Sequence, residues 1–126
     1  MDKNYQLALL YFVHLLVSAD GVTDIDELNA WSKIQQEENF SDSIIHEFEE
    51  IKNSKTEREI YQTALDYLTP CTDLEKLKVF ATLYKLSEVD GRVHPKEIRL
   101  LLYSLKGAGI EFDDVVNYVK ANSFMF

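Results

Sequence analysis

Residues 20–27 read Asp20-Gly21-Val22-Thr23-Asp24-Ile25-Asp26-Glu27, and residues 90–97 read Asp90-Gly91-Arg92-Val93-His94-Pro95-Lys96-Glu97. Both segments follow one pattern: Asp-Gly, five residues, then Glu. The two copies lie 70 positions apart (90 − 20 = 70), and each follows an apolar stretch, residues 7–17 and 77–87. A pattern repeated at this distance predicts a duplicated unit of helix, acidic loop and helix.

The rest of the chain favours an all-α fold. Only two Pro and four Gly interrupt its 126 residues, and apolar side chains recur at helical spacing. We expect one domain, residues 1–126, folded as a compact bundle of about seven helices. Helices are predicted over about 4–18, 24–38, 41–51, 56–69, 72–89, 95–106 and 111–122.

Local signals mark three of the predicted helix starts. Thr56 with Glu59, and Thr72 with Glu75, have the spacing of a capping box, in which each side chain hydrogen-bonds the other residue's backbone N–H. Pro95 suits a first helical position because its ring fixes φ and the missing N–H is not needed there.

Charge is distributed unevenly along the chain. The net charge is −9, and residues 1–75 carry 16 Asp/Glu against 5 Lys/Arg, whereas residues 76–126 carry 6 against 8. An acidic first part repels phosphate backbones and anionic lipid, so we expect no binding to nucleic acid. The same charge favours cations or a protein partner with a basic surface.

Two features bear on location. Cys71 is the single cysteine, so an internal disulfide is impossible, which fits a reducing compartment such as the cytoplasm. The apolar run 7–17 is too short for a bilayer, which needs about 20 residues, so we expect a buried helix and no membrane insertion.

Helix capping accounts for much of the repeated motif. Gly21 and Gly91 suit the residue that ends a helix, and Asp24 can cap the next helix with Glu27 three positions later. The spacing of Gly and Glu also occurs in EF-hand loops. However, Leu16 and Leu86 would then occupy the first ligand positions of the two loops, where an oxygen ligand is required, so neither copy is an ordinary EF-hand.

Surplus carboxylates favour a metal site. Capping uses two acids, whereas the first loop holds four within eight residues: Asp20, Asp24, Asp26 and Glu27. Oxygen ligands of this kind favour Ca²⁺ or Mg²⁺. The second loop offers a mixed nitrogen and oxygen set that also suits Zn²⁺: Asp90, His94 and Glu97. Both interpretations, capping and cation binding, stay open at this point.

The two loops, each behind an apolar helix, resemble the tellurite-resistance TerB-like domain. The resemblance covers essentially the whole chain, including the segment 109–114 before the last predicted helix. It implies a bundle of about seven helices and a bacterial, mostly cytoplasmic protein linked to tellurite or general stress responses. It also implies a metal-binding role for Asp20, Glu27, Asp90 and Glu97. The second loop departs from the pattern, because His94 and Lys96 make it less acidic.

The expected function is therefore a non-enzymatic module that binds a divalent cation. The alternative is a protein-interaction module, like the helical module of J-domain co-chaperones that some TerB-like proteins resemble, with an acidic docking face and purely structural loops. A hydrolase using the paired carboxylates is disfavoured, because neither a nucleophile motif nor a phosphate loop accompanies them. His14 and Cys71 are interpreted as structural residues.

Overall fold

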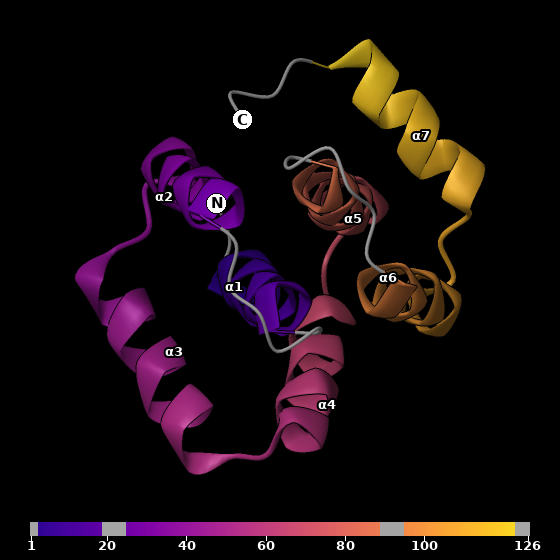
Figure 1. Cartoon of the computed structure of the whole chain (residues 1–126). Helices are drawn as coiled ribbons and strands as arrows, with labels where there is room; N and C mark the ends of the chain where they lie inside the picture. The colour runs from indigo at the N-terminus through magenta and orange to yellow at the C-terminus, as the bar shows by residue number, and fades with distance from the viewer. Residues whose placement is uncertain (1–2, 19–24, 89–94, 123–126) are drawn as a thin grey trace.

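The computed structural model describes residues 3–18, 25–88 and 95–122, with the side chains of residues 18, 25–28 and 95–98 outside the description. Within these ranges the chain forms helices and no strand (Figure 1). The all-α fold predicted from the sequence is confirmed. The helices are α1 (Lys3–Ser18), α2 (Ile25–Glu38), α3 (Asp42–Ser54), α4 (Glu57–Leu68), α5 (Asp73–Ser87), α6 (Pro95–Ala108) and α7 (Phe112–Ala121).

Helix α1 lies at the centre of the bundle. It contacts α2, α3, α4, α5 and α6, and Figure 1 shows α2, α3 and α4 arranged around one side of it. From Leu7 to Val13 every residue is buried, because the sequence is apolar all round the helix. The expectation that the run 7–17 forms a buried helix is confirmed.

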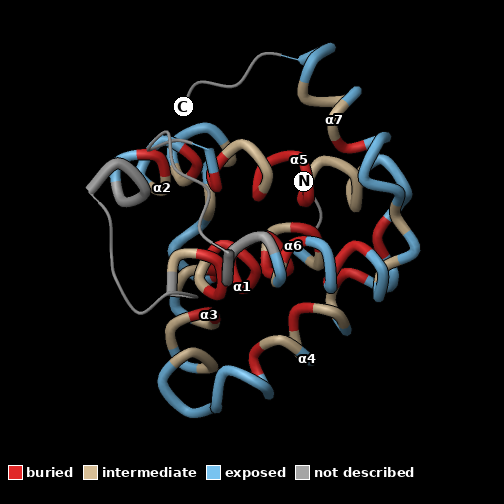
Figure 2. Tube along the Cα trace, turned by 45° about the vertical axis from the view of Figure 1, so that its right-hand side comes forward, coloured by how far each residue is buried: buried red, intermediate tan, exposed pale blue. Residues whose placement is uncertain are grey.

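Helix α5 lies beside α1 and is the second helix with a largely buried surface. Phe80 packs against Phe12 of α1, with ring centroids 5.7 Å apart, and α6 and α7 cover the other side of α5 (Figure 1). Figure 2 shows the buried residues gathered on these two helices and on the inward sides of the others. The helical spacing of α5 predicts a core face of Leu77, Phe80, Ala81, Tyr84 and Val89, with Leu83 and Leu86 beside it. Phe80, Ala81, Leu83 and Leu86 are buried and Leu77 and Tyr84 are half-buried, while Val89 lies outside the described residues.

The predicted capping boxes are present in α4 and α5. Thr56 Oγ1 accepts from the N–H of Glu59 at 3.2 Å, and the Glu59 carboxylate accepts from the N–H of Thr56 at 3.0 Å. The matching distances for Thr72 and Glu75 are 3.1 and 2.9 Å. Each box satisfies two backbone donors that a helix start leaves without partners.

Two sequence expectations at helix ends need correction. Residues 52–54, expected in a connection, belong to α3. Ser41 caps the start of this helix, and at its end the backbone N–H of Lys55 still donates to the carbonyl of Ile51. The apolar spacing of the last helix predicts that Phe112 faces inward together with Val115 and Val119, but Phe112 is 38% exposed. It is the first residue of α7, and its ring meets that of the half-buried Tyr84 with ring centroids 5.6 Å apart.

Candidate functional site

The structure describes the helices around the two acidic loops but not the loops themselves. Four of the seven candidate ligands lie outside the described residues: Asp20, Asp24, Asp90 and His94. Three belong to described helices, but their side chains are not described: Asp26 and Glu27 in α2, and Glu97 in α6. Whether these seven side chains come together therefore stays a prediction.

The helix starts do agree with the motif. Helix α2 begins at Ile25 and α6 at Pro95, again 70 positions apart (95 − 25 = 70). Glu27 and Glu97 are thus each the third residue of a helix, while the Asp-Gly pair of each motif precedes that helix. A carboxylate in a first turn is favoured by the helix dipole. In the described ranges, no three His, Cys, Asp or Glu side chains are grouped so that they could hold a metal ion.

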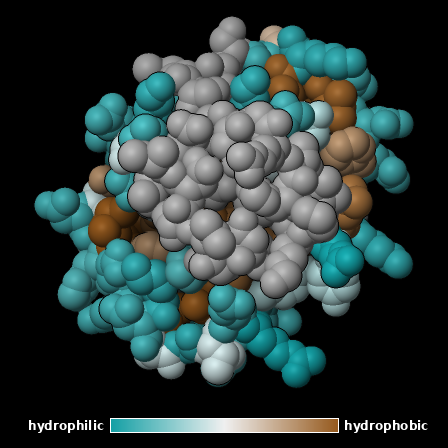
Figure 3. Space-filling model, in the orientation of Figure 1, coloured by the Kyte–Doolittle hydropathy of each residue, from teal (hydrophilic) through white to brown (hydrophobic). Residues whose placement is uncertain are grey.

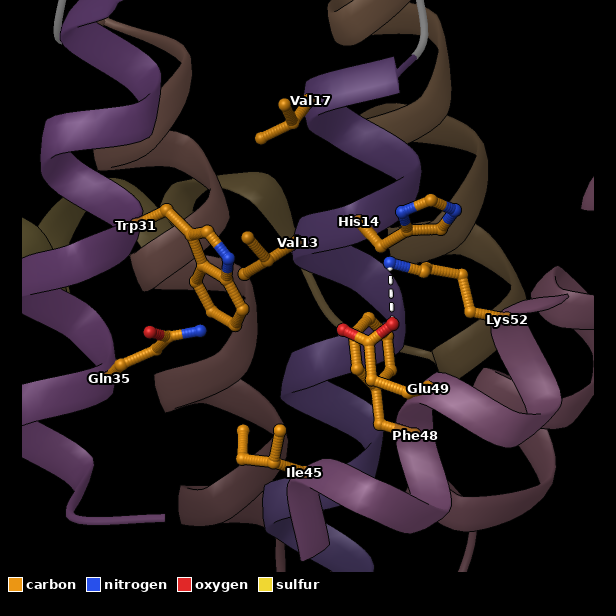
Figure 4. A pocket seen from close by; sticks show the side chains of 9 residues that line it. All are labelled: Val13, His14, Val17, Trp31, Gln35, Ile45, Phe48, Glu49 and Lys52. Carbon is orange, nitrogen blue, oxygen red and sulfur yellow. Dashed lines mark ion pairs between the residues drawn. The ribbon is translucent and has the colours of Figure 1, made fainter. Parts of the chain in front are cut away.

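A pocket of about 210 Å³ lies between α1, α2 and α3 (Figure 4). Its walls are mainly apolar and aromatic, with polar groups among them. The lining residues are Val13, His14 and Val17 from α1, Trp31 and Gln35 from α2, and Ile45, Phe48, Glu49 and Lys52 from α3.

Packing behind the pocket holds two of its walls in place. Val13 is 1% exposed, and the ring of Phe48, 5% exposed, lies 5.4 Å from the ring of Tyr11 in the core. Trp31 is half-buried and contacts Phe40 across a centroid distance of 6.4 Å. The pocket is therefore bordered by side chains that the fold already orients.

The charged groups of the pocket neutralise one another. Lys52 Nζ lies 2.8 Å from a carboxylate oxygen of Glu49, and the same nitrogen lies 5.5 Å from the centre of the Phe48 ring (Figure 4). Burial, and then the nearby Lys52, lower the pKa of His14 below its usual value. The lowered pKa of His14 favours the neutral imidazole near pH 7, and the Lys52–Glu49 pair contributes one charge of each sign to the pocket.

This pocket is not predicted by the sequence, because its lining residues are far apart along the chain. The sequence indicates a structural role for His14 at the core or its boundary, and Trp31 recurs at helical spacing with Leu28 and Ile34. Both residues are half-buried, which agrees with a boundary position for His14, because each lies at the edge of the core beside the opening between α2 and α3. A single histidine, His14, interrupts the otherwise apolar run 7–17, and this was the one signal in the sequence for a polar group at this place.

A second surface feature lies on α6. Leu102 and Tyr103 are 47% and 68% exposed, and Arg99 and Lys106 flank them along the same helix. Figure 3 shows hydrophobic surface gathered on the α6 and α7 side of the molecule, apart from smaller patches on the α3 side. Exposed apolar side chains grouped in this way are typical of contact surfaces.

No protein-family model, curated protein or solved structure matches this chain. The resemblance to the TerB-like domain therefore rests on the two loop motifs and their setting. None of the helices in the described ranges combines the length and apolar character needed to cross a bilayer.

Proposed function

We propose that the chain is a non-enzymatic helical module of the TerB-like kind that binds a divalent cation at its two Asp-Gly-x5-Glu loops. One observation supports this proposal: both motifs coincide with a helix start at the same relative position, so that Glu27 and Glu97 are each the third residue of a helix. The cytoplasmic location and a role in stress responses belong to the same proposal and come from the resemblance.

The first loop is the stronger cation site, because all four of its candidate ligands are carboxylates: Asp20, Asp24, Asp26 and Glu27. Their oxygens suit Ca²⁺ or Mg²⁺. In the second loop, His94 adds a nitrogen ligand beside Asp90 and Glu97, a set that also suits Zn²⁺. Cation binding would offset the repulsion among carboxylates that the acidic first part of the chain creates.

The test is a titration of metal-free protein with Ca²⁺, Mg²⁺ or Zn²⁺, followed by backbone NMR. We expect the amide signals of Gly21 and Gly91 to shift and saturate, and Asp20→Asn to weaken the Gly21 response about tenfold or more. Asp66→Asn is the matched control, because Asp66 is exposed on α4. Gly21 and Gly91 signals that stay unchanged up to about 1 mM ion would eliminate the cation proposal.

A second candidate function is a protein-interaction module that docks a partner with a basic surface. Exposed acids on α3 and α4 favour it: Asp42, Glu57 and Asp66. Glu50 is also exposed but lies 3.0 Å from His46, and the carboxylate of Glu59 is engaged in its capping box. Other acids are less available, since Glu47 pairs with Lys3 at 3.0 Å and Glu49 pairs with Lys52.

A synthetic helical peptide of Leu and Lys tests this second candidate. We expect it to shift amide signals on α3 and α4, with an affinity that falls as salt rises. Glu57→Lys with Asp66→Lys should weaken binding, whereas the matched pair Asp113→Lys with Asp114→Lys on α7 should not. Equal losses in both double variants would show only non-specific attraction and would exclude a docking face on α3 and α4. The titration is run with chelator, so its result is independent of the cation test.

A further inference from the structure

We propose that the pocket between α1, α2 and α3 binds a small, neutral aromatic molecule of one or two fused rings that carries one hydrogen-bonding group. This site is separate from the cation loops, since its lining residues come from described parts of α1, α2 and α3 and include none of the seven candidate metal ligands.

The volume of the pocket sets the size of the ligand. At about 210 Å³ it exceeds an engineered cavity of about 150 Å³ that holds benzene, and it is smaller than the pockets of about 300 Å³ and above that take drug-sized ligands. A single substituted ring or a fused pair fits between these limits.

The walls favour an aromatic ring. In Figure 4, the indole of Trp31 lies on one side of the pocket and Phe48 on the other, with Val13 between them and Ile45 below. A ring inserted here meets aromatic faces and edges from two helices, and such contacts contribute beyond the area they bury. Because Val13 and Phe48 are held by the core, little ordering is needed on binding.

The charges favour a neutral molecule. Lys52 and Glu49 pair at 2.8 Å, so an anion drawn to Lys52 would face the carboxylate, and a cation drawn to Glu49 would face the ammonium. A neutral ligand leaves this pair intact and avoids the cost of desolvating a charge.

Hydrogen bonding comes from groups that can both donate and accept. The amide of Gln35 extends toward the pocket beside Trp31, and the imidazole of His14 lies near the opposite wall (Figure 4). A neutral amide, hydroxyl or ring N–H can pair with the Gln35 amide, which both donates and accepts, while His14 lies at the rim beside Lys52 (Figure 4). The Gln35 amide would fix the orientation of the ring within the apolar walls.

Three probes that share one ring but differ in charge test the proposal: benzamide, benzoate and benzylamine. Trp31 is the chain's single tryptophan, so one indole Nε1–H signal in the NMR spectrum reports directly on the pocket. We expect benzamide to shift this signal and the amides of Val13 and Phe48 saturably, with a Kd of about 1 mM or below. Benzoate and benzylamine should bind at least about tenfold more weakly.

Two variants separate pocket binding from non-specific effects. Val17→Phe places a ring in the pocket and should abolish the benzamide shifts, while Val116→Phe on α7 is the matched control that should retain them. Gln35→Leu should weaken benzamide several-fold with the fold unchanged, as judged by the spread of the amide signals. An unshifted Trp31 signal at about 10 mM benzamide overturns the proposal. Tighter binding of either charged probe overturns the choice of a neutral ligand.

All titrations are performed with chelator present and repeated with saturating Ca²⁺. We expect the same benzamide response in both, because the pocket and the cation loops use different side chains. A failure of the cation titration therefore leaves this proposal standing, and a failure of the benzamide titration leaves the cation proposal standing. A benzamide response that requires Ca²⁺ would contradict the separation of the two sites.

Discussion

The ammonium nitrogen of Lys78 lies 3.1 Å from a carboxylate oxygen of Glu38 whose side chain is only 8% exposed. The same carboxylate oxygen accepts a hydrogen bond from the hydroxyl of Tyr5 at 3.1 Å, and Lys78 Nζ lies 5.5 Å from the centre of the Tyr5 ring. Because Tyr5, Glu38 and Lys78 belong to α1, α2 and α5, this network ties the end of α2 to both central helices. Burial, with the adjacent Glu38 charge, strongly raises the pKa of Tyr5.

Removing the cation from this network should destabilise the protein more than neutralising the acid. Lys78→Met takes the ammonium partner away from a nearly buried carboxylate, and we expect a loss of about 2–3 kcal/mol in the free energy of unfolding. Glu38→Gln keeps an acceptor for Tyr5 and leaves a lysine that can reach water, so a loss of about 1 kcal/mol is expected. Urea denaturation measures both.

The double variant and a surface control complete this test. Lys78→Met combined with Glu38→Gln should be more stable than Lys78→Met alone, because no unpaired charge then stays buried. Lys106→Met, at an exposed position of α6, should change stability by less than about 0.5 kcal/mol. Additive losses in the double variant would contradict the proposed coupling.

His14 should make the folded state lose stability as the pH falls. Its folded-state pKa is lowered, by burial and by Lys52, while Glu57 and Glu49 act in the opposite direction to a smaller extent. Between that pKa and the unfolded value of about 6.5, the unfolded chain binds more protons. The stabilisation is therefore present above pH 6.5 and is lost as the pH falls toward the folded pKa.

Two measurements check this pH dependence. An NMR titration of His14 should give a pKa below 6.5, and Lys52→Met should raise it. In urea denaturation, the stability of wild type minus that of His14→Gln should decrease from about pH 7.5 to 5.5. A difference that grows on acidification would show that His14 gains a proton more readily in the folded state.

Much of the fold could be predicted because its signals are local. The capping pairs Thr56–Glu59 and Thr72–Glu75, the run 7–17 and Pro95 each act within one helix, and the structure has helices where they indicate them. The position of Phe112 could not be predicted, since its exposure depends on how α7 meets α5.

The cation loops and the pocket also differ in whether their residues are close together in the sequence. The loop motif is visible in the sequence because its residues are neighbours. The pocket is not visible, because Trp31, His14 and Lys52 come from three helices and meet only after those helices pack. A lone histidine or tryptophan on an apolar face gives no indication of the groups opposite it. The internal duplication is supported by the matching helix starts and stays a prediction.

The capping boxes should contribute measurably to stability. Thr56→Ala and Thr72→Ala each remove an acceptor for the backbone N–H three residues later, and we expect a loss of about 1 kcal/mol for each. Because the two boxes lie on different helices, their losses should add within about 0.5 kcal/mol. Ser43→Ala, at an exposed position within α3, is the control and should be neutral or slightly stabilising. A neutral result for both threonines would show that water caps these helices equally well.

Two apolar residues of α5 provide a matched test of the core. Phe80 is fully buried and contacts Phe12. Leu74, the second residue of the same helix, is 65% exposed. Phe80→Ala should cost about 3–5 kcal/mol, because it removes the transfer free energy of the ring and leaves a cavity between the two central helices. Leu74→Ala should change stability by less than about 0.5 kcal/mol. Urea denaturation of both variants measures the difference. A small loss for Phe80→Ala would mean that α1 and α5 can close over the missing ring, and would contradict their place as the packed centre of the bundle.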